Sequence, residues 1–159
     1  MSHVEINTEL KVYSLICLER AAKALGLQLN VGQETWKWYG KWVDDFHGET
    51  AAYKNGIDTK DYGKCLHAIV DPLTPDGYEI GLVANPDEKV GGLLPVLDTF
   101  GSKGAHILGI VGERFRKLCQ LYWNECCIEA AQVSNCSYEW EWVGNEIEGT
   151  ITDFNHQGG

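Results

Sequence analysis

A long helical pattern near the C-terminus places the strongest constraint on how this chain can fold. Apolar residues recur at helical spacing over about residues 107–133 and predict one long amphipathic helix. A second helix is predicted at 15–25, where Ser14 is suited to cap the start and Gly26 to end it. Each helix has one apolar side, so both need another layer to pack against.

Short alternating segments supply that layer. The predicted strands are residues 3–8, 27–31, 65–70, 78–84 and 93–97, followed by a terminal hairpin over about 138–154. Turn residues between the third and fourth strands predict a hairpin there, and Pro95 predicts that the fifth strand is an edge or carries a bulge. The order predicts an α+β two-layer sandwich, with a mostly antiparallel sheet and two helices on one face.

The length of 159 residues fits one domain with a real core. We expect a single α+β domain over 1–154, with an inserted aromatic and polar excursion at about 32–64. Residues 155–159 are expected to be a flexible tail.

Charge and cysteine usage exclude several classes of partner. The formal net charge of -10 disfavours duplex nucleic acid and anionic membrane surfaces. No apolar run approaches the roughly 20 residues that cross a bilayer, and the N-terminus lacks signal-peptide features, so a cytoplasmic protein is expected. The six cysteines include no Cys-x-x-Cys pair, so we expect free thiols and no metal.

The aromatic segment Glu34–His47 is the first candidate for function. Its tryptophans Trp36, Trp38 and Trp42 lie among charged residues, and they are suited to stack on a base or to anchor a partner protein. They share parity, so a plain strand would put all three on one face. A role as core or edge filler is an equally good interpretation.

A second candidate is the glycine-rich stretch Gly101–His106, which is predicted to be a turn before the long helix. Backbone N–H groups at a helix start favour an anion, and Lys103 adds charge. Arg114 and Lys117 lie three apart and would share a helix face, where they could bind a phosphate or a carboxylate. The alternatives are a flexible turn and a solvated helix surface.

Catalytic and metal-binding patterns are weak. Cys65 and His67 would share a strand face, but nothing identifies the third ligand that a metal site needs. The pair Asp44-Asp45 with His47 could supply general acid and base groups. The sequence shows no His–Asp dyad and no nucleophile elbow.

Several short motifs resemble the domain of unknown function family 1257, whose members occur in cyanobacteria, plastids and phages. The motifs are Met1-Ser-His3, Leu18-Glu-Arg-Ala-Ala-Lys-Ala-Leu-Gly26, Tyr78-Glu-Ile-Gly-Leu-Val83, Asn85-Pro-Asp87, Leu118-Cys-Gln-Leu-Tyr122 and Glu129-Ala-Ala131. The resemblance covers most of the chain except residues 32–64. The family's tryptophan-containing segment before the last helix is absent, and Leu97–Gly101 stands in its place. The resemblance supports the fold and implies no established reaction.

The combined hypothesis is a non-enzymatic protein that binds a small, nucleotide-like molecule without a cofactor. A phage-type sequestering protein is one form of this hypothesis. The predicted ligand-binding residues are Trp36, Trp38, Trp42, His47, Lys103, His106 and Arg114. One alternative is a small hydrolase that acts on a nucleotide-like substrate through His47 or His106. Another is a protein-interaction module that uses tryptophans to bind a partner or to form a homo-oligomer.

Overall fold

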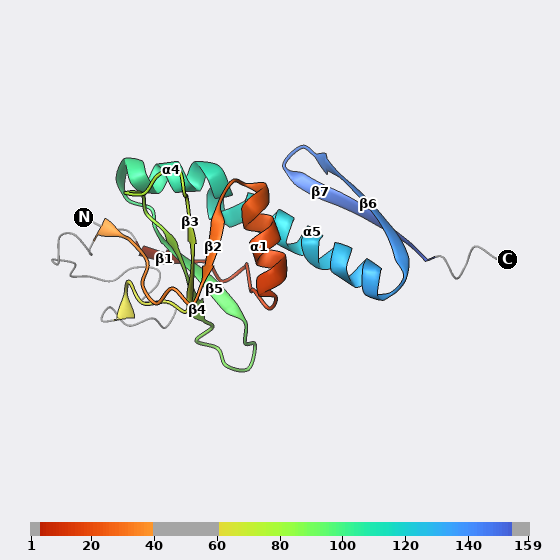
Figure 1. The fold of residues 1–159 in the computed structure, drawn as a ribbon, viewed down its shortest axis with the longest axis horizontal. Helices are drawn as coiled ribbons and strands as arrows, with labels where there is room; N and C mark the ends of the chain where they lie inside the picture. Colours follow the sequence, from red (N-terminus) through yellow and green to blue (C-terminus); the bar gives the residue numbers. More distant parts are fainter. Residues whose placement is uncertain (1–3, 40–60, 154–159) are drawn as a thin grey trace.

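The computed structural model describes residues 4–39 and 61–153. Its elements are β1 (Val4–Ile6), α1 (Leu15–Ala24), β2 (Gln28–Val31), β3 (His67–Val70), β4 (Ile80–Ala84), β5 (Leu93–Asp98), α4 (Gly101–Val111), η2 (Glu113–Phe115), α5 (Arg116–Val133), β6 (Cys136–Val143) and β7 (Glu146–Asp153). Figure 1 shows one group of strands beside the helices and a separate β6–β7 hairpin that runs along α5. The predicted α+β class is confirmed.

The main sheet is antiparallel throughout, with the order β1-β5-β4-β3-β2. The predicted β3–β4 hairpin is confirmed, with Ala68 paired to Gly81. Strand β1 pairs with β5, so the first and the last strands of the sheet in sequence are neighbours in space. The terminal hairpin is also confirmed, but β6 and β7 form their own two-stranded sheet.

The expectation that Pro95 marks an edge or a bulge is wrong, because β5 lies between β1 and β4. The carbonyl of Pro95 accepts a hydrogen bond from the Asn7 N–H (2.9 Å), at the point where the three-residue β1 ends. The N–H that proline lacks would point the same way. The proline therefore removes one bond at the last position of a short pairing, which the sheet tolerates.

The helices of the described residues pack on one face of the sheet. A single apolar core joins Leu18 of α1, Ile107 of α4 and Leu118 of α5 to Ile80 and Leu82 of β4. Helix α1 begins as predicted, with the Ser14 hydroxyl accepting from the Cys17 N–H, and it ends before Gly26, whose φ is +76°.

The prediction of one continuous helix over 107–133 is wrong. Helix α4 begins at Gly101, so the predicted glycine-rich turn is itself helical, and α4 stops at Val111. Gly112 then adopts φ 84° and ψ 159°, a conformation that glycine reaches easily. The apolar spacing continues across the break because α4 and α5 face the same core, and this is why the pattern resembled one helix.

The other face of the sheet is covered by the described ends of the aromatic excursion. Trp36, Trp38 and Tyr62 form a second core with Val4 and Val96. Trp36 and Trp38 pack with their ring centroids 6.0 Å apart, and Tyr62 meets Trp38 edge-on at 5.8 Å. The central strands β3, β4 and β5 are therefore buried on both faces, whereas the edge strand β2 is partly exposed.

The β6–β7 hairpin and the part of α5 from Gln120 onward, to which it is bonded, form a projection that we call the arm. Figure 1 shows the arm extending away from the main sheet. The Tyr138 hydroxyl donates to the Asn124 side chain, and the Ile147 N–H donates to Gln120 Oε1 (2.9 Å). These bonds hold the hairpin against α5. Within the described part of the chain, no helix has the length and apolar character that crossing a membrane requires.

Candidate functional site

The predicted ligand-binding residues that the structure describes are not gathered into one exposed site. Trp36 is completely buried and Trp38 nearly so, which leaves neither ring open for stacking on a ligand. Lys103 and His106 lie on α4, and Arg114 lies in η2. Trp42 and His47, together with Asp44 and Asp45, lie outside the described residues.

The indole of Trp36 packs directly on the backbone of β4. A Cβ atom at Gly81 would lie 2.5 Å from Trp36 Cδ1, closer than carbon atoms approach each other without a bond. Gly81 therefore provides the flat surface on which the ring sits. The Trp36 indole N–H is buried and finds no hydrogen-bond partner in the described parts of the chain.

The structure contains a His–Asp pair, so the expectation of no dyad is wrong. His106 Nε2 lies 2.8 Å from Asp71 Oδ2, and the Thr74 hydroxyl donates to the same oxygen (2.9 Å). The Asp71 side chain is 8% exposed and that of His106 is 48% exposed. The hydrogen bond from His106 is the main cause that lowers the pKa of Asp71. The pair connects the β3–β4 turn to α4, two segments that no local sequence pattern brings together.

Asp71→Asn is expected to lower the free energy of unfolding by about 1–2 kcal/mol at pH 6, through the loss of hydrogen bonds to a charged group. The folded-state pKa of Asp71 lies below its unfolded value, so its contribution is present above the unfolded pKa and is lost as the pH falls through the folded pKa. Urea unfolding at pH 6 and at pH 2.5 should show the difference from wild type shrinking in acid. Asp76→Asn, in the same turn but exposed, is the control; an equal effect there would contradict this role of Asp71.

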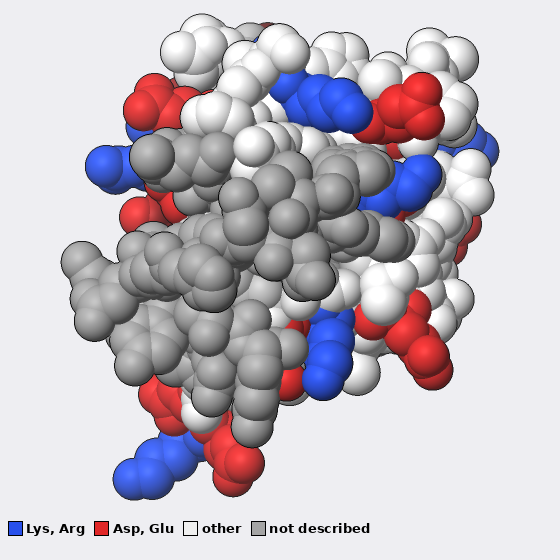
Figure 2. Space-filling view, turned by 90° about the vertical axis from the view of Figure 1, so that its left-hand side faces the viewer, with Lys and Arg blue, Asp and Glu red and all other residues white. Residues whose placement is uncertain are grey.

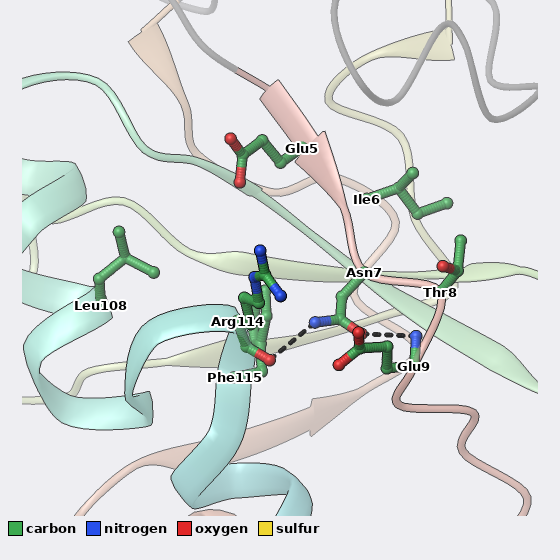
Figure 3. Close-up of a pocket in the computed structure, with 8 residues that line it drawn as sticks. All are labelled: Glu5, Ile6, Asn7, Thr8, Glu9, Leu108, Arg114 and Phe115. Atoms are coloured by element: carbon green, nitrogen blue, oxygen red, sulfur yellow. Dashed lines mark hydrogen bonds between the residues drawn. The ribbon is translucent and has the colours of Figure 1, made fainter.

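An open pocket of about 210 Å³ lies between the segment after β1 and η2. Figure 3 shows the guanidinium of Arg114 between the carboxylates of Glu5 and Glu9, with Leu108 on another side of the same space. Asn7 forms part of the wall. Its amide donates to the Arg114 carbonyl (2.8 Å), and its Oδ1 accepts from the Glu9 N–H (2.8 Å). The pocket holds one cationic and two anionic side chains.

The backbone beside this pocket is strained. Arg114 has φ 56° and ψ 30°, and Phe115 has φ 59° and ψ 25°, so two consecutive non-glycine residues are left-handed. This conformation costs each residue about 1–2 kcal/mol. The prediction that Arg114 and Lys117 share a helix face is wrong, because Arg114 precedes α5. Nothing in the sequence pattern indicates this geometry, although Gly112 directly after Val111 is typical of a helix end.

The arm carries the most exposed tryptophans of the described chain. Trp123 on α5 and both Trp140 and Trp142 on β6 are 42–45% exposed, and Ile151 on β7 is 52% exposed. The strand register puts Trp140, Trp142 and Ile151 on the hairpin face that also carries Tyr138, the residue bonded to α5. The opposite face is acidic, with Glu139, Glu141, Glu146 and Glu148. Sequence reasoning predicted the hairpin and missed this surface, although the alternation of aromatic and acidic residues in β6 signals it.

Surface charge elsewhere is mixed. Figure 2 shows Lys and Arg side chains beside Asp and Glu side chains on the described part of one face. That part of the face has no broad basic area of the kind that nucleic-acid backbones need.

Cys65 and His67, the pair considered above as metal ligands, form hydrogen bonds within the chain, and so does Cys17. All six cysteines are free. Cys65 Sγ donates to the Gln33 carbonyl (3.0 Å), and His67 Nδ1 accepts from the Gly32 N–H (2.9 Å). Cys17 Sγ contacts Glu129 Oε2 at 3.0 Å, and burial raises the pKa of Cys17 to about 12, which keeps this thiol protonated and unreactive at neutral pH.

Comparisons of the chain with protein families, with curated proteins and with solved structures gave no match. The resemblance to the domain of unknown function family 1257 rests on the quoted motifs and stays a prediction.

Proposed function

We propose that the chain is a protein-interaction module that self-associates through its arm. The observation that carries the proposal is the exposure of Trp123, Trp140 and Trp142 together on one projecting part of the molecule. Soluble monomers seldom leave several large aromatic side chains half exposed in one region, and such surfaces are typical of binding interfaces. A second copy of the chain is the proposed partner.

The open edges of the hairpin support self-association. Among the described strands, β6 and β7 pair only with each other, so each has one edge without a partner strand, and on β7 the Ile147 N–H donates to the Gln120 side chain. Eight residues of exposed edge are long enough to pair with another strand. A two-stranded hairpin is also marginally stable by itself, and added strands stabilise it.

The sequence of β7 is complementary to itself. In an antiparallel pairing of two β7 strands centred on Gly149, Ile147 would face Ile151 of the other copy, and Glu146 would face Thr152. Glu148 would face Thr150, so no carboxylates oppose each other. A pairing of two β6 strands centred on Trp140 would place Glu139 opposite Glu141 of the other copy, which destabilises a sheet. Strand β7 is therefore the favoured edge.

The proposal predicts a dimer whose stability depends on the charge at residue 152. Thr152→Lys would place a cation opposite Glu146 of the other copy, and Thr152→Glu would place an anion there. The dimer contains two such symmetric pairs, each contributing about 0.2–1 kcal/mol. Thr152→Lys should therefore lower the dimer Kd by about 2- to 30-fold, and Thr152→Glu should raise it by a similar factor. Within its own hairpin Thr152 faces Ser137, which is neutral, so the intrachain effect is small. Light scattering across a concentration series measures Kd.

The matched controls are Ser137→Lys and Ser137→Glu, on the strand that is not at the proposed interface. Both should leave Kd near the wild-type value. Added salt should tighten the dimer, because it screens the repulsion between two chains of net charge -10. A chain that stays monomeric at all concentrations would refute the proposal. So would a dimer whose Kd is the same whether residue 152 carries a positive or a negative charge.

The proposed compartment is the cytoplasm, since reducing conditions suit six free thiols. Nucleotide-like ligands and hydrolase activity stay predictions. The burial of Trp36 and Trp38 gives base stacking no support from the described residues, whereas the His106–Asp71 pair gives the hydrolase a polar pair on the surface.

A further inference from the structure

The pocket at Arg114 has a charge pattern suited to a particular kind of small molecule. Its charged lining is one guanidinium, Arg114, and two carboxylates, Glu5 and Glu9, all three of them on exposed residues. Among the described residues none of these side chains forms an ion pair with another. The three groups sum to a charge of -1 in a space of about 210 Å³.

We propose that this pocket binds a basic amino acid, a small molecule with one carboxylate and two cationic nitrogens. The carboxylate would pair with the Arg114 guanidinium, which presents a fork of N–H donors matched to two carboxylate oxygens. The cationic nitrogens would face Glu5 and Glu9. The two glutamates repel a polyphosphate, and the pocket is smaller than the roughly 300–1,000 Å³ of sites for drug-sized ligands, so a nucleotide is disfavoured.

The strained backbone supports this role for Arg114. Glycine would adopt the left-handed conformation at position 114 without the steric cost, yet the chain has an arginine there. The adjacent Phe115 is buried in the main core, and Asn7 bonds the Arg114 carbonyl, so the conformation is held from both sides. The strain keeps the guanidinium over the pocket, as strained residues often do at binding sites.

The test is isothermal calorimetry of the full chain with L-lysine, L-glutamate and ATP. L-lysine should bind, whereas L-glutamate and ATP should bind at least about tenfold more weakly, because each adds negative charge beside Glu5 and Glu9. Arg114→Gly should reduce L-lysine affinity by about tenfold or more while the thermal midpoint stays at or above the wild-type value. Glu5→Gln should also weaken L-lysine binding.

Arg116→Ala is the matched control. It removes the same charge two residues further along the chain, from a side chain that does not line the pocket. It should leave the affinity for L-lysine unchanged. Absence of heat with L-lysine at millimolar concentration would refute the proposal. So would L-lysine binding that survives Arg114→Gly, or ATP binding that is tighter than that of L-lysine. None of these results depends on whether the chain dimerises through β7, since the pocket lies in a different part of the fold.

Discussion

Trp36→Ala is expected to lower the free energy of unfolding by about 3–5 kcal/mol, the range for removing a large buried aromatic side chain. Trp36 is completely buried and, with Trp38, is one of the two largest side chains in the core of the second sheet face. Urea unfolding followed by circular dichroism measures the change. Trp36→Phe should cost clearly less, because it keeps an aromatic ring and removes an indole N–H that has no partner among the described residues.

The contact with Gly81 offers an internal control for this prediction. Gly81→Ala alone should destabilise the chain by about 1–3 kcal/mol, because its Cβ would overlap the Trp36 ring. In the Trp36→Ala background the same substitution should cost little, since the overlapping ring is gone. Additive losses in the double variant would show that Trp36 does not rest on Gly81.

Tyr122→Phe is expected to cost about 2–3 kcal/mol, more than the loss of one hydroxyl usually does. The Tyr122 hydroxyl accepts from the N–H groups of Tyr13 (2.8 Å) and Ser14 (3.1 Å) at the start of α1. Phenylalanine would leave both N–H donors without this partner in a partly buried place. Each fully buried, unsatisfied donor costs about 1–3 kcal/mol, and partial burial places the loss in the lower part of that range. Urea unfolding gives the loss, and hydrogen exchange should become faster at these two amides.

Tyr13→Phe is the matched control for Tyr122→Phe. The Tyr13 side chain is exposed, and its hydroxyl donates to the Val90 carbonyl at 3.2 Å. Surface changes of this kind usually stay within about 0.5 kcal/mol. An equal loss from both substitutions would contradict the role assigned to the Tyr122 hydroxyl.

Much of the fold follows from local patterns in the sequence. The strands and α1 lie close to their predicted ranges because alternation, the Ser14 cap and Gly26 act within a few residues. The break at Gly112 was not predicted, because apolar periodicity shows which side is buried and does not show whether the backbone is continuous. The helical state of Gly101–His106 was not predicted, because the local residue propensities favour a turn. The packing of Ile107 in the main core favours a helix instead.

The candidate sites were predictable only in part. The charge of Arg114 led to the prediction that it binds a ligand, whereas Glu5 and Glu9, which line the same pocket, were not predicted because β1 and η2 are distant in sequence. The polar neighbours of Trp36 and Trp38 in the sequence suggested an exposed strand. The segment instead packs on the second face of the sheet, where both tryptophans are buried. Whether a tryptophan is buried depends on pairing partners that a single segment does not reveal.

The neighbouring position of β1 and β5 has a consequence for synthesis of the chain. Translation makes residues 4–6 first, but their pairing partners at 96–98 emerge only after most of the sheet has been made. The bond between Asn7 and Arg114 joins positions 107 residues apart, so the pocket cannot form before the chain has been made through Phe115. A ligand in that pocket would not bind a shorter nascent chain, and it would stabilise only molecules in which β1 has paired with β5.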